Sequence, residues 1–119
     1  EVSRIMLAIK VLMQDRINKN TLIFDEIDLG VSGKTAENLG LNILNLSKKT
    51  QVICISHLPQ IASKGDCHYR VFKHLDNNKT LSSVTKLGYE DRVTEIAKML
   101  SGRKITESSL SQAKYLLDR

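Results

Sequence analysis

Two short apolar stretches of the chain end in side chains that can carry phosphate chemistry. The first runs directly into the neighbouring acids Asp25 and Glu26, with a third acid at Asp28, and the second ends at His57. A carboxylate at a strand end can hold Mg²⁺ through the water shell of the ion, because Mg²⁺ keeps several of its waters. An adjacent carboxylate can orient or deprotonate the water that attacks a terminal phosphate. These residue types therefore favour a magnesium–nucleotide site, in which an imidazole can donate a hydrogen bond to a phosphate oxygen.

Two predicted strands and the helix between them would bring these side chains to one place. Residues 21–25 form a short apolar run without alternation, which predicts a strand buried on both faces, as in a parallel sheet. A helix at about 35–48 follows, with Ser32 or Thr35 as its cap, and a second apolar strand covers residues 51–56. This order predicts a right-handed βαβ unit, whose strands end at the sheet edge where ligands bind. The helix is expected to bury an apolar stripe formed by Ala36, Leu39, Ile43 and Leu46.

The other segments predict helices and one hairpin. Apolar residues at helical spacing predict an amphipathic helix over residues 2–17. Alternation at 68–73, β-formers at 80–87 and a turn signal between them predict an antiparallel hairpin at the edge of the sheet. Two further helices are predicted around residues 93–100 and 110–117, the first stopped by the Ser-Gly pair that follows it. The fold is therefore expected to be α/β.

Composition limits the class of protein without identifying it. At 119 residues the chain is one domain or a piece of one, and its start inside a helical pattern, without an initiator Met, favours a piece. A net charge of +5 permits contact with nucleic acid, but the basic residues are scattered. The two cysteines, Cys54 and Cys67, indicate a reducing compartment, and no apolar run approaches the roughly 20 residues that span a bilayer. The expected location is the cytoplasm.

The first apolar stretch and the residues around it resemble motifs of a known superfamily. Residues 22–26, Leu-Ile-Phe-Asp-Glu, look like the Walker B strand of ABC-type ATPases. Asp28 then stands at the D-loop position and His57 at the switch-histidine position. The resemblance implies that Asp25 coordinates magnesium through water and that Glu26 acts as the catalytic base. It also implies that Asp28 communicates across a dimer of ATPase heads and that His57 senses the γ-phosphate of ATP.

Within that superfamily the chain is similar to the RecN family of bacterial DNA repair proteins, which are relatives of the SMC proteins. The similarity is carried by residues 25–33, Asp-Glu-Ile-Asp-Leu-Gly-Val-Ser-Gly, and by residues 55–60, Ile-Ser-His-Leu-Pro-Gln. The first ten residues resemble the stretch that begins at the last residue of the family's Leu-Ser-Gly-Gly-Glu signature. Residues 92–102 resemble the end of the family's sequences. The resemblance therefore spans essentially the whole chain.

Membership of this family implies a particular architecture and role. The chain, residues 1–119, would be the C-terminal segment of an ABC/SMC-type P-loop ATPase head, a mainly parallel sheet flanked by helices with an antiparallel edge hairpin. The complete head would be made from both chain ends, joined by a long antiparallel coiled coil. Two heads would sandwich two ATP molecules with Mg²⁺. The implied partners are the N-terminal head lobe, a second copy and DNA, in double-strand break repair at the bacterial nucleoid.

The chain also departs from the complete ATPase pattern. It contains no Gly-x-x-x-x-Gly-Lys-[Ser/Thr] sequence, so the Walker A loop that cradles phosphates is missing. Gly33-Lys-Thr35 imitates the end of that loop, but it lacks the earlier glycine and follows a D-loop, not a strand. We interpret it as the entry to a helix. Only Glu1 remains of the signature motif, so this segment alone is not expected to hydrolyse ATP efficiently.

Three alternatives compete with the interpretation of the chain as part of an ATPase head. A zinc site could use Cys54, His57, Cys67 and His68, but Cys54 lies within an apolar strand, where cysteine behaves as a small hydrophobe. A hydrolase triad of Ser56, His57 and Asp25 lacks the Gly-x-Ser-x-Gly elbow. The chain could also be a non-catalytic interaction module that docks the N-terminal lobe or a partner head, with apolar surface exposed in its absence. Pairs of basic residues at 48–49 and 103–104 could contact DNA phosphates, although a solvated surface is their ordinary setting.

Overall fold

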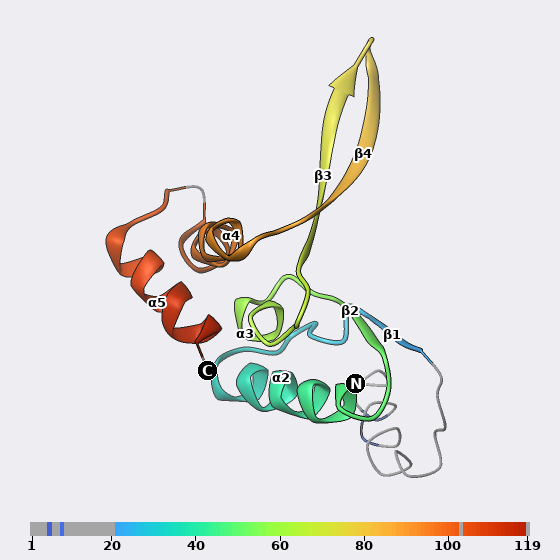
Figure 1. Cartoon of the computed structure of the whole chain (residues 1–119), viewed down its shortest axis with the longest axis vertical. Helices are drawn as coiled ribbons and strands as arrows, with labels where there is room; N and C mark the ends of the chain where they lie inside the picture. Colours follow the sequence, from blue (N-terminus) through green and yellow to red (C-terminus); the bar gives the residue numbers. More distant parts are fainter. Residues whose placement is uncertain (1–4, 6–7, 9–20, 103, 119) are drawn as a thin grey trace. The chain divides into compact units, whose positions relative to one another are not determined.

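The computed structural model describes residues 5, 8, 21–102 and 104–118. The predicted helix over residues 2–17 and the basic residue Arg103 therefore lie, apart from residues 5 and 8, outside the described part of the chain. Two compact units divide the chain, Glu1–Lys64 and Gly65–Arg119, and each is described by itself. Figure 1 shows the elements in order along the chain.

The first unit contains the βαβ arrangement that the sequence predicts. Strand β1 (Leu22–Asp25) is followed by helix α2 (Gly33–Ser47), strand β2 (Val52–Ile55) and the short helix α3 (Pro59–Ala62). The two strands pair in parallel, with a register that runs from Leu22 opposite Val52 to Asp25 opposite Ile55. Both strands therefore end at the same edge, as expected for two parallel strands joined by a helix.

Helix α2 covers one face of this pair of strands and forms the core with it. Its buried residues include the predicted stripe, and Gly40 is buried as well. Ser32 stands at the N-cap position, as predicted, but its side chain makes no capping hydrogen bond. The core cluster joins both strands, the turn after β1, α2 and α3, and consists of Leu22, Phe24, Ile27, Val31, Ala36, Leu39, Ile43, Leu46 and Ile61.

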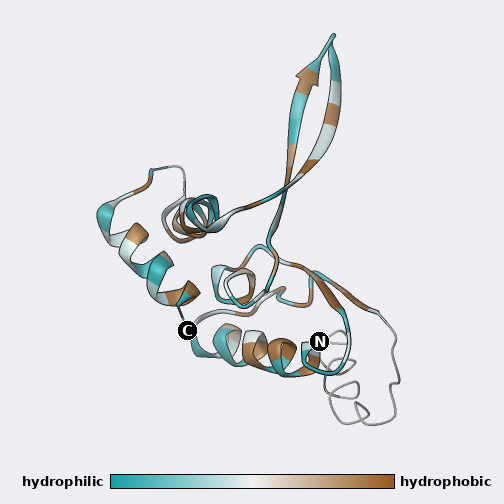
Figure 2. Ribbon diagram, in the orientation of Figure 1, coloured by the Kyte–Doolittle hydropathy of each residue, from teal (hydrophilic) through white to brown (hydrophobic). Residues whose placement is uncertain are grey.

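The prediction that β1 is buried on both faces is wrong. Leu22 and Phe24 are buried, whereas Ile23 between them is 62% exposed. Strand β2 repeats the pattern, with Ile53 46% exposed and Ile55 54% exposed. Successive side chains of a strand point to opposite faces, and within the first unit the described helices α2 and α3 join the core on the Leu22–Phe24 side. The brown strands in Figure 2 therefore include an apolar face open to solvent.

The second unit begins with a hairpin. Strands β3 (Tyr69–Asp76) and β4 (Lys79–Lys86) pair antiparallel along their whole length. The two residues between them, Asn77 and Asn78, have φ values of 45° and 61°, which is the left-handed geometry of a two-residue hairpin turn. Within the described residues this hairpin is a sheet of its own and does not extend the edge of β1 and β2. Hydrophobic and hydrophilic segments follow one another along its strands (Figure 2).

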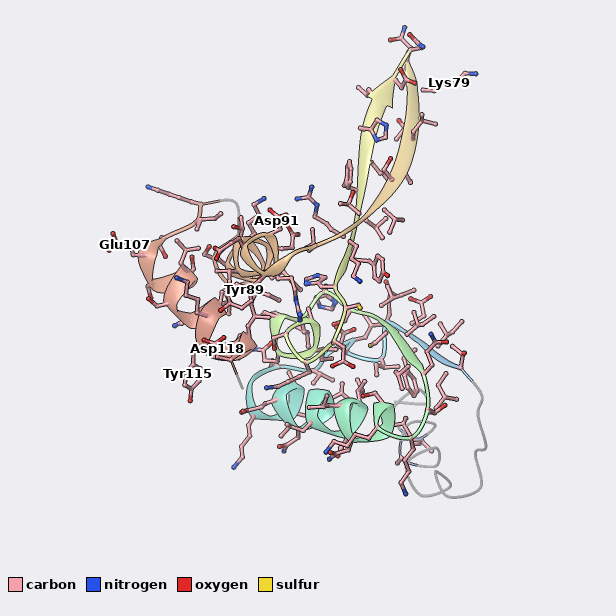
Figure 3. The ribbon with its side chains drawn as sticks, viewed as in Figure 1. Lys79, Tyr89, Asp91, Glu107, Tyr115 and Asp118 are labelled. Atoms are coloured by element: carbon pink, nitrogen blue, oxygen red, sulfur yellow. The ribbon has the colours of Figure 1, made fainter. Side chains whose placement is uncertain are left out.

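Two helices complete the second unit. Helix α4 (Tyr89–Ser101) packs against helix α5 (Glu107–Leu117) through an apolar face that includes Val93, Ile96, Ala97 and Ala113. Gly102, with φ of 74°, ends α4 at the predicted place, and Thr106 caps α5 by accepting a hydrogen bond from the Ser109 N–H. The Tyr89 hydroxyl donates to Asp118 at 3.0 Å and ties the start of α4 to the end of α5 (Figure 3). No described helix is long and apolar enough to cross a membrane.

Candidate functional site

The two neighbouring acids lie at the carboxyl end of β1. Asp25 is the last residue of the strand and lies opposite Ile55, the last residue of β2. The Glu26 N–H donates to the Ile55 carbonyl at 3.2 Å, so the pairing of the strands continues one residue further. Glu26 has φ of 50°, an uncommon conformation for a residue with a side chain, and such positions cost about 1–3 kcal/mol. The backbone thus turns sharply away from the sheet at the second acid.

Both carboxylates at this edge are accessible. The side chains of Asp25 and Glu26 are exposed, and neither makes a hydrogen bond or ion pair with another described residue. Unpaired carboxylates at a strand end have the chemistry that a hydrated magnesium ion needs, because Mg²⁺ binds one or two carboxylates and keeps waters in its other positions. The described residues contain no group of three or more His, Cys, Asp or Glu side chains that could enclose a metal ion. Two exposed carboxylates at a strand end can therefore hold a hydrated ion through its waters.

The turn after β1 carries Asp28 into the interior. The Leu29 N–H donates to the Glu26 carbonyl and the Val31 N–H donates to the Asp28 carbonyl, at 3.4 and 3.0 Å. Gly30, with φ of 69°, supplies the left-handed conformation within this turn. Asp28 has an exposed fraction of 0%. Asp28 is therefore among the most buried of the described residues.

The carboxylate of Asp28 is held by the residues that follow β2. Its Oδ2 atom accepts hydrogen bonds from the Ser56 hydroxyl at 2.5 Å and from the His57 backbone N–H at 3.2 Å. Nδ1 of the His57 imidazole lies 3.4 Å from the same oxygen. The Ser56 hydroxyl oxygen in turn accepts from the Leu58 N–H at 3.0 Å. The turn after β1 and the loop after β2 are thus joined by one carboxylate oxygen.

The buried charge of Asp28 is incompletely compensated and acts on a neighbour. Its Oδ1 atom has no hydrogen-bond partner among the described residues. Cys54, on β2, is half-buried, and burial raises the pKa of its thiol from 9.0 to about 11, with a smaller contribution from the negative charge of Asp28. A thiol with this pKa stays protonated at neutral pH and is a poor nucleophile.

The structure brings some of the predicted site residues into contact and places others side by side along the sheet. Asp28 and His57 are in direct contact, and Asp25 and Glu26 lie at the same edge on the neighbouring strand. The His57 side chain is 65% exposed, so its ring remains accessible while its Nδ1 side faces Asp28. The hydrogen bond between Ser56 and Asp28 was not predicted from the sequence. The sequence feature that could have indicated it is the hydroxyl residue directly before His57, at the end of the adjacent strand.

The contacts around Asp28 and the positions of the cysteines argue against a hydrolase triad and a zinc site. A hydrolase triad needs its serine hydroxyl to donate to the imidazole. Here the Ser56 hydroxyl donates to the Asp28 carboxylate. For zinc, Cys54 is a half-buried strand residue and Cys67 is exposed in the second unit, and no metal-binding group of three such side chains occurs in the described ranges.

The fold is similar to that of a solved SMC ATPase. The match has a TM-score of 0.62 at 19% sequence identity, and it covers 86% of this chain and 60% of the solved chain. That chain comes from work on ATP-driven dimerisation and DNA-stimulated activation of SMC ATPases. The α/β arrangement of a parallel strand pair, flanking helices and a hairpin is therefore the fold of an SMC-type ATPase, as the sequence predicts.

Sequence comparison narrows the class further. The chain is 46% identical over 118 residues to the DNA repair protein RecN of Haemophilus influenzae, covering 99% of this chain and 21% of that protein. It is 44% identical to RecN of Rickettsia conorii over 98% of the chain and 22% of that protein. RecN of Halalkalibacterium halodurans is 42% identical over 99% of the chain and 21% of its own length. No family model matches the chain.

The chain is thus a RecN-like segment with an SMC-type ATPase fold, and it spans about one fifth of the length of the curated relatives it matches. The family resemblance read from the sequence motifs is confirmed.

Proposed function

We propose that residues 1–119 form the C-terminal segment of an ATPase head that binds and hydrolyses ATP when two heads dimerise. In this proposal the longer protein acts in the repair of DNA double-strand breaks. The proposal rests on the RecN relatives and on one structural observation. That observation is that Asp25, Glu26 and His57 lie at or just beyond the carboxyl ends of two paired parallel strands. Parallel sheets bind ligands at this edge.

Each of the three side chains has a proposed role. Asp25 would hold Mg²⁺ through its water shell, and its exposed carboxylate without a described partner suits that role. Glu26 would act as the base that orients and deprotonates the attacking water. His57, with 65% of its side chain exposed, would donate a hydrogen bond to the γ-phosphate when its ring is protonated.

Magnesium bound at this edge would neutralise the charge that develops on the β- and γ-phosphates. The chain itself supplies no Walker A loop, so backbone groups that cradle the phosphates would come from another part of the longer protein. The resemblance assigns that part to the N-terminal lobe of the head. The other proposed partners are a second copy of the head and DNA, and the proposed location is the bacterial cytoplasm, at the nucleoid.

A second candidate function is a non-catalytic interaction module that docks the N-terminal lobe or a partner head. It is favoured by the exposed face of the β1–β2 sheet, where Ile23, Ile53 and Ile55 are between 46% and 62% exposed. Clustered apolar side chains on a surface are typical of a protein interface. The two candidates share a docking surface, and they differ in whether the strand-end acids carry chemistry.

The test is the substitution Glu26→Gln in the longer protein. It removes the basic carboxylate and keeps its size, so we expect nucleotide affinity to stay within about twofold while turnover falls by about 10²- to 10⁴-fold, the usual contribution of a general base. Steady-state hydrolysis and equilibrium binding of a fluorescent ATP analogue measure the two effects. Glu107→Gln, at an exposed carboxylate of the second unit, is the matched control and should leave both unchanged. Undiminished turnover of Glu26→Gln would contradict the catalytic assignment and favour the interaction module.

A further inference from the structure

Asp28 is a predicted site residue whose surroundings do not match those expected for its role. The family resemblance gives it a role between two heads. Its exposed fraction is 0%, and its hydrogen bonds run to Ser56 and His57 of its own chain. The carboxylate that contacts His57 is therefore buried within the same unit that carries the strand-end acids.

We propose that Asp28 is a positioning residue for His57, which it holds in the tautomer that carries hydrogen on Nδ1. The inference rests on the proposed function for its effect on turnover, while the contact itself stands on the geometry of the chain. Asp28 would act through the imidazole and would not touch the nucleotide.

The chemistry of the two facing atoms indicates the tautomer. A carboxylate oxygen can only accept, so the contact of 3.4 Å between Nδ1 and Oδ2 is favourable when Nδ1 bears the hydrogen. In a neutral ring the second nitrogen, Nε2, is then an acceptor, and in a protonated ring Nε2 becomes a donor. The exposed side of the imidazole thus changes from acceptor to donor by gaining a single proton. A ring nitrogen that can either accept or donate suits a side chain that contacts a phosphate oxygen or a water molecule.

The backbone around His57 supports the same role. Asp28 also accepts from the His57 N–H, and the Ser56 hydroxyl links Asp28 to the Leu58 N–H. Ser56 and His57 therefore bond one buried oxygen directly, and Leu58 is linked to it through the Ser56 hydroxyl. These bonds hold the backbone of His57 where Nδ1 of its ring lies 3.4 Å from the same oxygen. Residues that hydrogen-bond and orient metal-binding side chains contribute about 10- to 100-fold to activity, and we expect an effect of this size here.

The proposal predicts a spectroscopic signature. We would label the longer protein with ¹⁵N-histidine, and His57→Gln would assign the ring signals of His57 by their loss. At pH 9, where an imidazole is ordinarily neutral, the wild-type protein should show His57 with hydrogen on Nδ1. Asp28→Asn should move hydrogen to Nε2, because an amide can donate to Nδ1 and favours the opposite tautomer. Hydrogen on Nε2 of His57 in the wild-type protein overturns the proposal, even if the variant does not fold.

Turnover of the longer protein separates positioning from a purely structural bond. Asp28→Asn should lower the rate at saturating ATP by about 10- to 100-fold and leave ATP affinity within about twofold. Ser56→Ala is the matched control, because it removes another hydrogen bond to the same oxygen while the Asp28–His57 contact remains. An equal loss of rate in both variants would show that Asp28 only braces the loop. Absence of ATP hydrolysis by the wild-type protein would refute the proposed function, and the tautomer would still decide the positioning.

Discussion

At the residue scale, the burial of Cys54 and, to a smaller extent, the nearby carboxylate of Asp28 make Cys54 an unreactive thiol. Burial, and to a smaller extent the charge of Asp28, raises its pKa from 9.0 to about 11. A higher pKa means less thiolate at a given pH, so at pH 8 the native thiolate fraction should be about 100-fold below that of an unshifted thiol. We expect alkylation of Cys54 by iodoacetamide to be slower by about this factor in the native chain than in urea, and to accelerate as the pH rises toward 11.

Cys67 must be removed for this measurement because it is exposed, so Cys67→Ser is the background. In that background Asp28→Asn should speed alkylation of Cys54 by much less than unfolding does, because the charge of Asp28 is the smaller of the two causes. Equal alkylation rates in native buffer and in urea would show that Cys54 is not buried as described.

The residues of the candidate site could be predicted from the sequence to different extents. Asp25, Glu26 and His57 each lie within two residues of the end of an apolar run, and that local pattern is enough to place them at or next to strand ends. The environment of Asp28 depends on a contact with Ser56, 28 residues away, which no local pattern encodes. Its burial, and hence its contact with the imidazole, is a property of the folded unit.

At the element scale, a close approach of two backbones explains the glycine in the middle of α2. A Cβ atom added at Gly40 would lie 2.8 Å from the carbonyl oxygen of Gln60, which is backbone and cannot move aside as a side chain could. Helix propensity alone favours Ala over Gly by about 1 kcal/mol. Overpacking costs about 1–3 kcal/mol, so we expect Gly40→Ala to destabilise the chain by up to about 2 kcal/mol in urea unfolding.

The sign of the change in the free energy of unfolding shows whether the close backbone contact or helix propensity dominates at Gly40. Asn42→Ala, at an exposed position of the same helix, is the control and should change the free energy of unfolding by no more than about 0.5 kcal/mol. A stabilised Gly40→Ala variant would mean that propensity decides and that α2 and α3 do not approach as closely as described.

The strands show why the elements were predicted better than their burial. Apolar runs located β1 and β2 correctly, but a run buried on both faces and a run with one exposed apolar face have the same sequence pattern. Ile23, Ile53 and Ile55 therefore gave no sign of their exposure. The hairpin, in contrast, was located by its alternation and by the two asparagines of its turn, because turn chemistry is local.

At the scale of the whole molecule, one proposal accounts for both the exposed sheet face and the missing phosphate-binding loop: a separate lobe would cover the first and supply the second. The chain spans 21% of the length of Haemophilus influenzae RecN, and its sequence lacks the Walker A motif. If a separate lobe supplies that motif, it would also cover apolar surface of the head, and the open face of the β1–β2 sheet is the candidate for that contact. Association and catalysis can then be measured separately, because different residues carry them.

We therefore expect the 119-residue chain alone to show no ATP hydrolysis, and activity to appear when it is mixed with a separately produced N-terminal segment that contains the Walker A loop. Glu26→Gln should abolish that activity without preventing association.

Ile53→Lys, which places a charge on the exposed face, should instead weaken association measured by calorimetry. The unfolding midpoint of the chain alone should change little, because Ile53 is already 46% exposed. Hydrolysis by the chain alone would show that phosphate binding does not need the missing loop. Association without hydrolysis in the mixture, under conditions where the intact protein turns over, would favour the interaction module over a split catalytic site.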